Sequence, residues 1–173
     1  MRLNWIVILL ISVIVAIAGS MLTSTGMAPL MGGESWYDGI HKPEFTPPGD
    51  IIGGVWTVLF VFGTISALIF WNLHMPFGRI RRSGRFWFIT VMFLLNACLN
   101  VFWSFLFFYQ HLVLAAFWDT IALGLTVVIL VVAIWPISKW ASTLLIPYAV
   151  WVAFASYLNY IIWFINFSNS VQI

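Results

Sequence analysis

The chain has 173 residues, of which 63% are hydrophobic and only 7% are charged, and its mean hydropathy is +1.06. A soluble domain carries about 25% charged residues, so this composition excludes a water-soluble globule. Seven Lys and Arg against five Asp and Glu give a net charge of +2, which is too small and too scattered for a nucleic-acid-binding surface. No nucleic-acid partner is therefore expected.

Five stretches of the chain are long and apolar enough to span a membrane, which takes about 20 residues. They are residues 5–22, 51–71, 86–109, 112–135 and 141–165. A β-barrel is excluded because its strands alternate apolar and polar residues, whereas residues 127–135 are apolar throughout. The sequence therefore predicts an all-α fold, in which residues 1–173 form one transmembrane domain built as a five-helix bundle in the lipid bilayer.

The first span begins like a secretory signal, because Arg2 precedes an apolar run that reaches Ala16-Ile17-Ala18. The run continues through Met21 and Leu22, so we expect a retained helix.

Basic residues in short loops predict the orientation in the membrane. Lys42 is the only one in the first loop, and the other six fall on the opposite side of the predicted topology: Arg2, Arg79, Arg81, Arg82, Arg85 and Lys139. The amino terminus is therefore predicted to be cytoplasmic, with the first loop and the carboxyl terminus outside. Short loops without targeting signals favour a bacterial cytoplasmic membrane.

Residues 23–50 form the long first loop, which holds five of the twelve charges. It also contains Trp36, Tyr37 and Phe45, which would be costly to leave in water, and Pro43, Pro47 and Pro48, which restrict the backbone. Long ordered loops are often binding loops or lids. We expect a structured lid, and a plain polar crossing of the outer surface is the alternative.

In the second span, one helical stripe carries Trp56, Phe60, Gly63, Ala67 and Trp71. Polar side chains mark the inward faces of later spans, because such groups usually face the bundle interior or a cavity. Asn96 and Asn100 share a face with Trp103 and Phe107, and Asn159 lies beside Ala155 on the face of Trp151. Either interhelical hydrogen bonds alone or a ligand would account for these asparagines.

Asp119 is the only charged residue inside a predicted span. Burial of an unpaired carboxylate in hydrocarbon is expensive, so we expect it to be protonated, hydrogen-bonded or open to a water-filled pocket. No predicted span contains histidine. A buried haem or zinc site is therefore not expected, and we predict neither a resident cofactor nor a metal.

These segments together resemble the translocator protein or tryptophan-rich sensory protein family (TspO/MBR, the peripheral-type benzodiazepine receptors), in its bacterial type. The matching segments are Trp36-Tyr37, Lys42-Pro43-Glu44-Phe45-Thr46-Pro47-Pro48, residues 55–60, Asn100 with Trp103 and Phe107-Phe108, Asp119, and Pro147-Tyr148 with Trp151, Phe154-Ala155 and Leu158-Asn159. They follow the family's order over nearly the whole chain.

The resemblance implies a receptor or sensor that binds porphyrins such as protoporphyrin IX, and isoquinoline-carboxamide and benzodiazepine-type ligands, in a pocket open toward the first loop. It also implies a homodimer. The family's pocket positions fall on Tyr37, Pro47, Trp56, Phe60, Asn100, Asp119, Trp151 and Ala155.

The resemblance further implies light- and oxygen-dependent porphyrin degradation. Trp56 and Trp151 are the expected catalytic residues, because an indole can donate an electron or scavenge reactive oxygen beside a photoexcited ring. Transport of porphyrin or sterol-like amphipaths is the alternative function.

Two positions depart from the family pattern. Animal members place a basic residue after the tyrosine of a cholesterol-recognition pattern, and none follows Tyr160 here. Cholesterol binding through that pattern is therefore not expected. Phe45 stands where many members have tryptophan.

Overall fold

The computed structural model describes residues 3–29, 33–73 and 84–168. Five of its helices are long and apolar enough to cross a membrane, which confirms the predicted all-α, polytopic fold. The long helices are α1 (Leu3–Met27), α3 (Gly49–Leu73), α4 (Gly84–Ser104), α5 (Val113–Ile134) and α7 (Ile146–Phe167). Two short helices, α2 (Trp36–Gly39) and α6 (Lys139–Thr143), and a π-helical turn, η2 (Phe105–Tyr109), complete the set.

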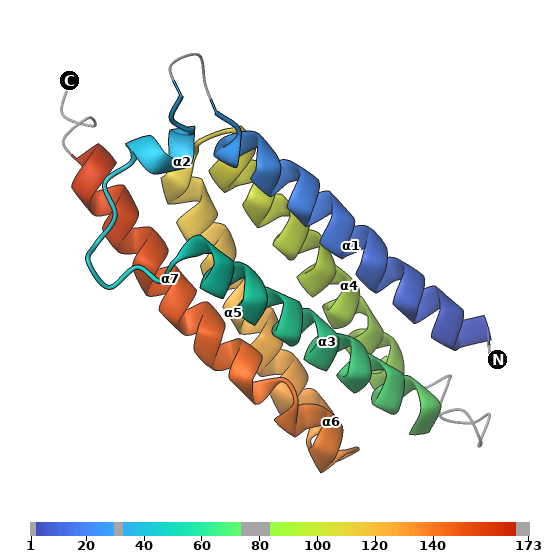
Figure 1. The fold of residues 1–173 in the computed structure, drawn as a ribbon. Coiled ribbons are helices and arrows are strands. Elements are labelled where there is room, and N and C mark those ends of the chain that lie inside the picture. Colours follow the sequence, from blue (N-terminus) through green and yellow to red (C-terminus); the bar gives the residue numbers. More distant parts are fainter. Residues whose placement is uncertain (1–2, 30–32, 74–83, 169–173) are drawn as a thin grey trace.

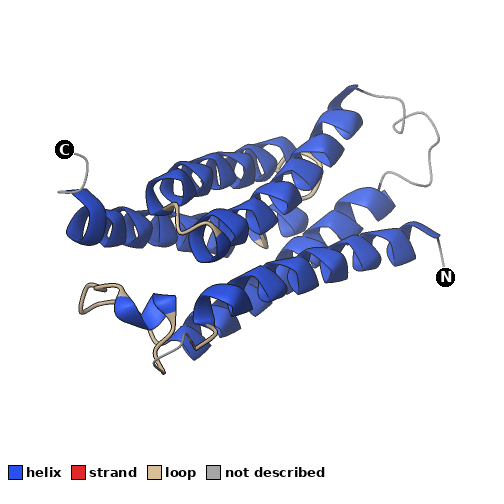
Figure 2. Cartoon of the chain, turned by 90° about the horizontal axis from the view of Figure 1, so that it is seen from above, coloured by secondary structure: helices blue, strands red, loops and turns tan. Residues whose placement is uncertain are grey.

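The five long helices lie side by side, with the start of α1 and the end of α7 at opposite ends of the bundle (Figure 1). Helix α5 packs against α4 and α7, while α1 packs against α3, α4 and η2. In the ranges that the structure describes, every named element is a helix (Figure 2). Helix α3 meets α7 only sparingly, and this looser side of the bundle bears on the site below.

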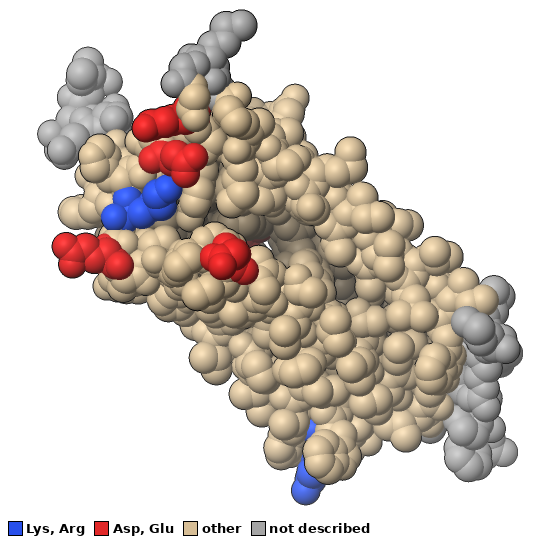
Figure 3. Space-filling view, viewed as in Figure 1, with Lys and Arg blue, Asp and Glu red and all other residues tan. Residues whose placement is uncertain are grey.

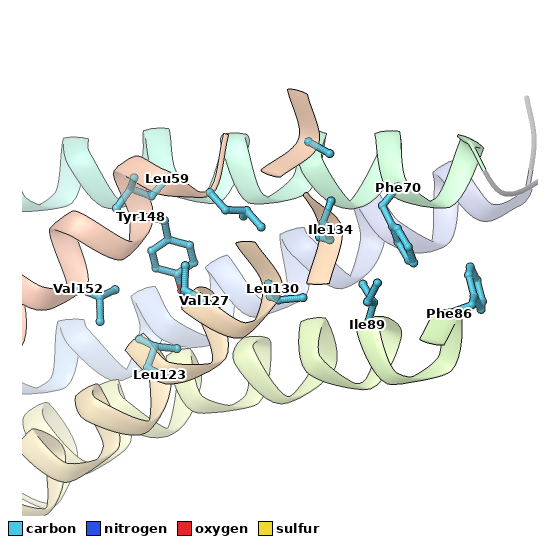
Figure 4. Packing of buried hydrophobic residues seen from close by; sticks show 12 residues of the cluster. Leu59, Phe70, Phe86, Ile89, Leu123, Val127, Leu130, Ile134, Tyr148 and Val152 are labelled. Carbon is cyan, nitrogen blue, oxygen red and sulfur yellow. The ribbon is translucent and has the colours of Figure 1, made fainter. Parts of the chain in front are cut away.

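The packed core lies between α3, α4, α5 and α7, where apolar side chains from all four helices point toward one another (Figure 4). Phe70 of α3 stacks on Phe86 of α4, with ring centroids 5.4 Å apart. Helices α5 and α7 approach closely at Gly124, where an added Cβ would lie 3.2 Å from Val152. In a bilayer such close contacts replace the hydrophobic effect as the main force between helices.

Helix α1 extends five residues beyond the predicted end of the first span. Its added turn carries Ser24 and Thr25, whose hydroxyls donate to the carbonyls of Met21 and Leu22 at 2.7 and 2.6 Å. These bonds satisfy the polar side chains locally, so the helix continues to Met27. The first loop is consequently shorter than residues 23–50.

The described part of the first loop is folded against the end of the bundle. Ser35 caps α2, and the indole of Trp36 stacks on His111 at 4.1 Å between ring centroids. The side-chain amide of Asn166 in α7 accepts from the backbone N–H of His41 and donates to its carbonyl, at 2.8 and 2.7 Å. The loop is thus held at two points, by the stacking of Trp36 on His111 and by the hydrogen bonds between His41 and α7.

The π-helical turn η2 widens the end of α4, as the bond from the Gln110 N–H to the Phe105 carbonyl shows. The chain then reverses at His111, whose φ of 58° is left-handed. The extra residue in the turn directs Phe107 and Phe108 inward, where both are buried. The sequence predicted an ordinary helix over this stretch.

Candidate functional site

A cavity of about 500 Å³ lies in the half of the bundle nearest α2; we call it the upper cavity. Its lining comes from α1, α2, α3, α4, η2, α5 and α7. The space-filling view shows the molecule hollowed between α1 and α3 (Figure 3). A volume of this size falls within the range of about 300–1,000 Å³ that is usual for small-molecule sites.

The structure brings six of the eight predicted ligand-binding residues together around this cavity. They are Tyr37, Trp56, Phe60, Asn100, Trp151 and Ala155. Pro47 and Asp119 are not part of the lining. Asp119 is buried in α5 beside Thr120, which does line the cavity, and its Oδ2 accepts no hydrogen bond from the described residues.

Aromatic rings form one wall of the upper cavity. Trp56, Trp103 and Phe107 stack in series, with centroids 6.5 and 5.1 Å apart and interplanar angles of 30° and 16°. Trp151 and Phe154 of α7 add a tilted pair at 5.3 Å. Stacked aromatic pairs contribute about 0.5–1.5 kcal/mol beyond area burial, so this wall favours a flat ring system.

A buried hydrogen-bond network closes the base of the upper cavity. The Asn100 Nδ2 donates to the Tyr148 hydroxyl at 2.6 Å, and that hydroxyl donates to Asn96 Oδ1 at 3.1 Å. The Asn96 Nδ2 in turn donates to the hydroxyl of Thr126 at 2.8 Å. The network joins α4, α5 and α7 and fixes the Asn100 side chain that lines the cavity.

Three donors on lining residues are buried and make no hydrogen bond within the described chain. They are the indole N–H groups of Trp103 and Trp151 and the side-chain amide of Asn159. Buried donors are usually paired. A ligand with acceptor oxygens could pair with them after small side-chain rotations.

The mouth of the upper cavity carries the charges of the first loop (Figure 3). The Lys42 ammonium donates to the Tyr37 carbonyl at 2.5 Å and lies 4.0 Å from the centre of the Tyr37 ring. Burial raises the pKa of the Tyr37 hydroxyl, and the charge of Asp38 raises it further. Tyr37 is therefore neutral at physiological pH, with a cation held over its ring.

Sequence reasoning did not assign the contribution of α1. Ala16, Gly19, Ser20 and Thr23 line the upper cavity at helical spacing. The available signal was a stripe of small residues in a helix otherwise rich in Leu, Ile and Val. Trp103 and Phe107 were predicted to share the inward face of Asn100, but they were not predicted to line a binding site.

In the described ranges, no three His, Cys, Asp or Glu side chains gather closely enough to hold a metal ion. The site consists of aromatic rings, amides and hydroxyls, and the described first loop adds Lys42 and four carboxylates at its mouth. This arrangement can bind and orient a flat amphipathic molecule.

Comparison with known proteins identifies the family to which this sequence belongs. The TspO/MBR family matches residues 7–164, which is most of the chain. The chain belongs to the TspO/MBR family. It is 35% identical to the tryptophan-rich protein TspO of Archaeoglobus fulgidus over 153 residues, covering 88% of this chain and 90% of the relative.

Other relatives come from bacteria and animals. The chain is 38% identical to the tryptophan-rich protein TspO of Bacillus cereus over 132 residues, covering 76% of this chain and 81% of the relative. It is 29% identical to the translocator protein of Sus scrofa over 146 residues, covering 84% and 82%. These TspO/MBR relatives support the assignment as an integral membrane protein.

Proposed function

We propose that this TspO/MBR protein is a membrane receptor or sensor that binds protoporphyrin IX and related amphipathic ligands in the upper cavity. The observation that carries the proposal is the stacked wall of Trp56, Trp103 and Phe107 beside a half-open cavity. A porphyrin ring can stack on these side chains, and it supplies the van der Waals contacts that the walls of an empty cavity lack. Isoquinoline-carboxamide and benzodiazepine-type ligands likewise carry flat aromatic rings on a mainly apolar body.

The position of Lys42 supports one orientation of the bound ligand. The carboxylates of a porphyrin would point to the mouth, where Lys42 is held over Tyr37. The ring would then lie between Trp56 of α3 and Trp151 of α7, both of which line the cavity. This orientation keeps the charged edge out of the hydrocarbon.

We further propose that light and oxygen cause breakdown of the bound ring. The photoexcited porphyrin would take one electron from the indole of Trp56 or Trp151, and the indole radical cation would release its N–H proton. Molecular oxygen would then bond to a meso carbon of the porphyrin radical anion, and the electron and proton would return to the indole. Opening of the resulting dioxetane would break the ring C–C bond and the O–O bond together and leave two carbonyl groups. Both indoles line the cavity, so a porphyrin bound there would lie next to both electron donors.

The deciding experiment follows the absorbance of protoporphyrin IX bound to the purified protein, in light and in darkness. Saturable binding and light-dependent bleaching are expected in the native protein. Trp56→Phe combined with Trp151→Phe should reduce bleaching more than binding, because phenylalanine keeps the apolar surface but is a poor electron donor. Trp118→Phe is the matched control, since Trp118 is exposed and does not line the cavity. Absence of saturable binding would refute the receptor, and unchanged bleaching would remove both indoles from the chemistry.

Transport of a porphyrin or sterol-like amphipath is the second candidate. The observation that favours it is a second cavity below the first, with Phe60 and Asn100 lining both. Saturable flux of porphyrin into vesicles that contain the protein would support transport. Binding without flux would support the receptor alone. The resemblance also implies a homodimer, and we propose that this protein forms one. Sedimentation of the purified protein in detergent tests this independently of ligand binding.

A further inference from the structure

A second cavity, of about 580 Å³, occupies the opposite half of the bundle; we call it the lower cavity. On α1 it is lined by residues 7–15, whereas the upper cavity is lined from residue 16 onward. Its inner wall includes Phe70, Leu130 and Leu145, each only 1% exposed. The lower cavity therefore reaches the centre of the bundle.

The lower cavity is open at the outer surface of the bundle. Val7 and Ile11 of α1 and Leu94 of α4 line it, yet they are 46%, 36% and 46% exposed. Because these helices span the membrane, this exposed rim faces lipid hydrocarbon wherever no second copy of the chain covers it. The molecules that surround the opening are thus phospholipid acyl chains.

The chemistry of the wall selects a hydrocarbon occupant. The Thr64 hydroxyl donates to Ser12 at 2.9 Å, and the Thr90 hydroxyl donates to the Phe86 carbonyl at 2.9 Å. The Tyr148 hydroxyl belongs to the asparagine network. Water requires two to four polar partners. The hydroxyls of Thr64, Thr90 and Tyr148 already donate within the bundle, and most of the other lining residues are apolar.

One lining donor differs from the others. The indole N–H of Trp71 is buried and has no hydrogen-bond partner in the described chain. Trp71 lies in the last turn of α3, at the level where interfacial tryptophans meet lipid headgroups. Ester carbonyls of phospholipids lie at the same depth and accept hydrogen bonds.

We propose that the lower cavity binds one acyl chain of a membrane phospholipid. The chain enters between α1 and α4, its ester end stays near Trp71, and its methylene groups run along the inner wall toward Tyr148. An empty apolar cavity would forfeit dispersion contacts on every wall, whereas an inserted chain restores them. The end of the bound acyl chain would come closest to a ligand in the upper cavity at Phe60 and Asn100, which line both cavities. This site does not depend on what the upper cavity binds.

Three glycines of α3 make the test specific. A Cβ added at Gly53, Gly54 or Gly63 would meet no atom within 4 Å. Gly63 lines the lower cavity, Gly53 lines the upper cavity, and Gly54 lines only a groove on the outer surface between α3 and α7. Gly63→Leu therefore fills the lower cavity, and Gly54→Leu is its matched control.

The experiment places the full chain in phosphatidylethanolamine and phosphatidylglycerol nanodiscs that contain a phospholipid with a diazirine in mid-chain. After illumination, mass spectrometry of peptides locates the adducts. Adducts on Leu130 and Leu145 are expected, since lipid outside the bundle cannot reach these buried side chains. They should be lost in Gly63→Leu and retained in Gly54→Leu.

Two results would overturn the proposal. Adducts confined to exposed Val7, Ile11 and Leu94 would show that lipid only coats the rim, or that a second copy of the chain covers it. Adducts on Leu130 and Leu145 that persist in Gly63→Leu would show entry by another route. Ala67→Phe, at another lining position, replaces Gly63→Leu if that variant fails to fold, and circular dichroism establishes folding for each variant.

Discussion

Ser35 shows how a single side chain positions the mouth of the upper cavity. Its Oγ accepts from the Asp38 backbone N–H at 3.1 Å and donates to the Asp38 carboxylate at 2.7 Å. The bond from the Asp38 N–H makes Ser35 the N-cap of α2, and it holds the single turn that carries Tyr37. The same hydrogen bonding lowers the pKa of Asp38 below its ordinary value, with a smaller contribution from Lys42.

Ser35→Ala should therefore loosen α2 and raise the pKa of Asp38. Loss of an N-cap costs about 1 kcal/mol, so ligand affinity in the upper cavity should fall as Tyr37 moves. Because the pKa of Asp38 is lowered in the folded protein, its support of α2 is present above its ordinary pKa and is lost as the pH falls through the folded value. NMR titration of Asp38 measures the shift, with Ser24→Ala in α1 as control. An unchanged Asp38 titration would contradict the capping role.

Among the elements, α1 owes its position to a close approach at Gly26. A Cβ added at Gly26 would lie 2.7 Å from Cδ1 and 2.9 Å from the backbone oxygen of Phe108 in η2. Backbone cannot yield as a flexible side chain can. At Gly19, by contrast, an added Cβ would lie 3.7 Å from the Ser104 Oγ, which is an ordinary contact.

Gly26→Ala is thus expected to push α1 away from η2 and lower the thermal stability. Overpacking costs about 1–3 kcal/mol, and a contact of 2.9 Å with a backbone oxygen places Gly26→Ala above the gain of about 1 kcal/mol in helix propensity. Gly19→Ala, on the same helix, should be neutral or stabilising. Thermal unfolding in one detergent compares the two. Equal melting temperatures would show that α1 is not held at Gly26.

The same elements mark how far the sequence predicts this structure. Span number and the inward faces of Trp56 and Asn100 follow from apolar length and helical spacing. The π-helical turn does not, because it packs against Gly26 of another helix. The α1 extension does not either, because the local bonds of Ser24 and Thr25 leave no mark in the hydropathy pattern. Pro47 came from the family resemblance alone, and Asp119 came both from its isolated charge and from the resemblance. Neither signal gives the local shape of this cavity.

At the scale of the whole molecule, the two cavities divide the bundle into halves of different chemistry. The upper half has aromatic rings, unpaired buried donors and a cation at its mouth. The lower half has hydroxyls that donate within the bundle, the indole N–H of Trp71 near its end, and an exposed rim toward hydrocarbon. Tyr148 and the two asparagines separate them. A ligand with a polar edge is therefore directed to one half and a lipid chain to the other.

The charge pattern predicts which half faces the cytoplasm. Lys42 lies at the end of the bundle with α2, and Arg85 and Lys139 begin helices at the other end. Arg2, Arg79, Arg81 and Arg82 lie outside the described residues, and the sequence assigns them to the same side as Arg85. Basic residues are retained on the cytoplasmic side, so the upper cavity should open outward.

Reporter fusions in a bacterial host test this orientation. Alkaline phosphatase after Ile173 should be active and green fluorescent protein there should be dark, because the carboxyl terminus is predicted to lie outside. Fusions after Ser138, in the connection between α5 and α6, should give the reverse pattern and serve as the internal control. Replacement of Arg79, Arg81 and Arg82 by alanine should mix the two orientations, since it removes half of the six cytoplasmic charges. Fluorescence after Ile173 in the native sequence would instead place the upper cavity on the cytoplasmic side, and its ligand would then have to come from within the cell.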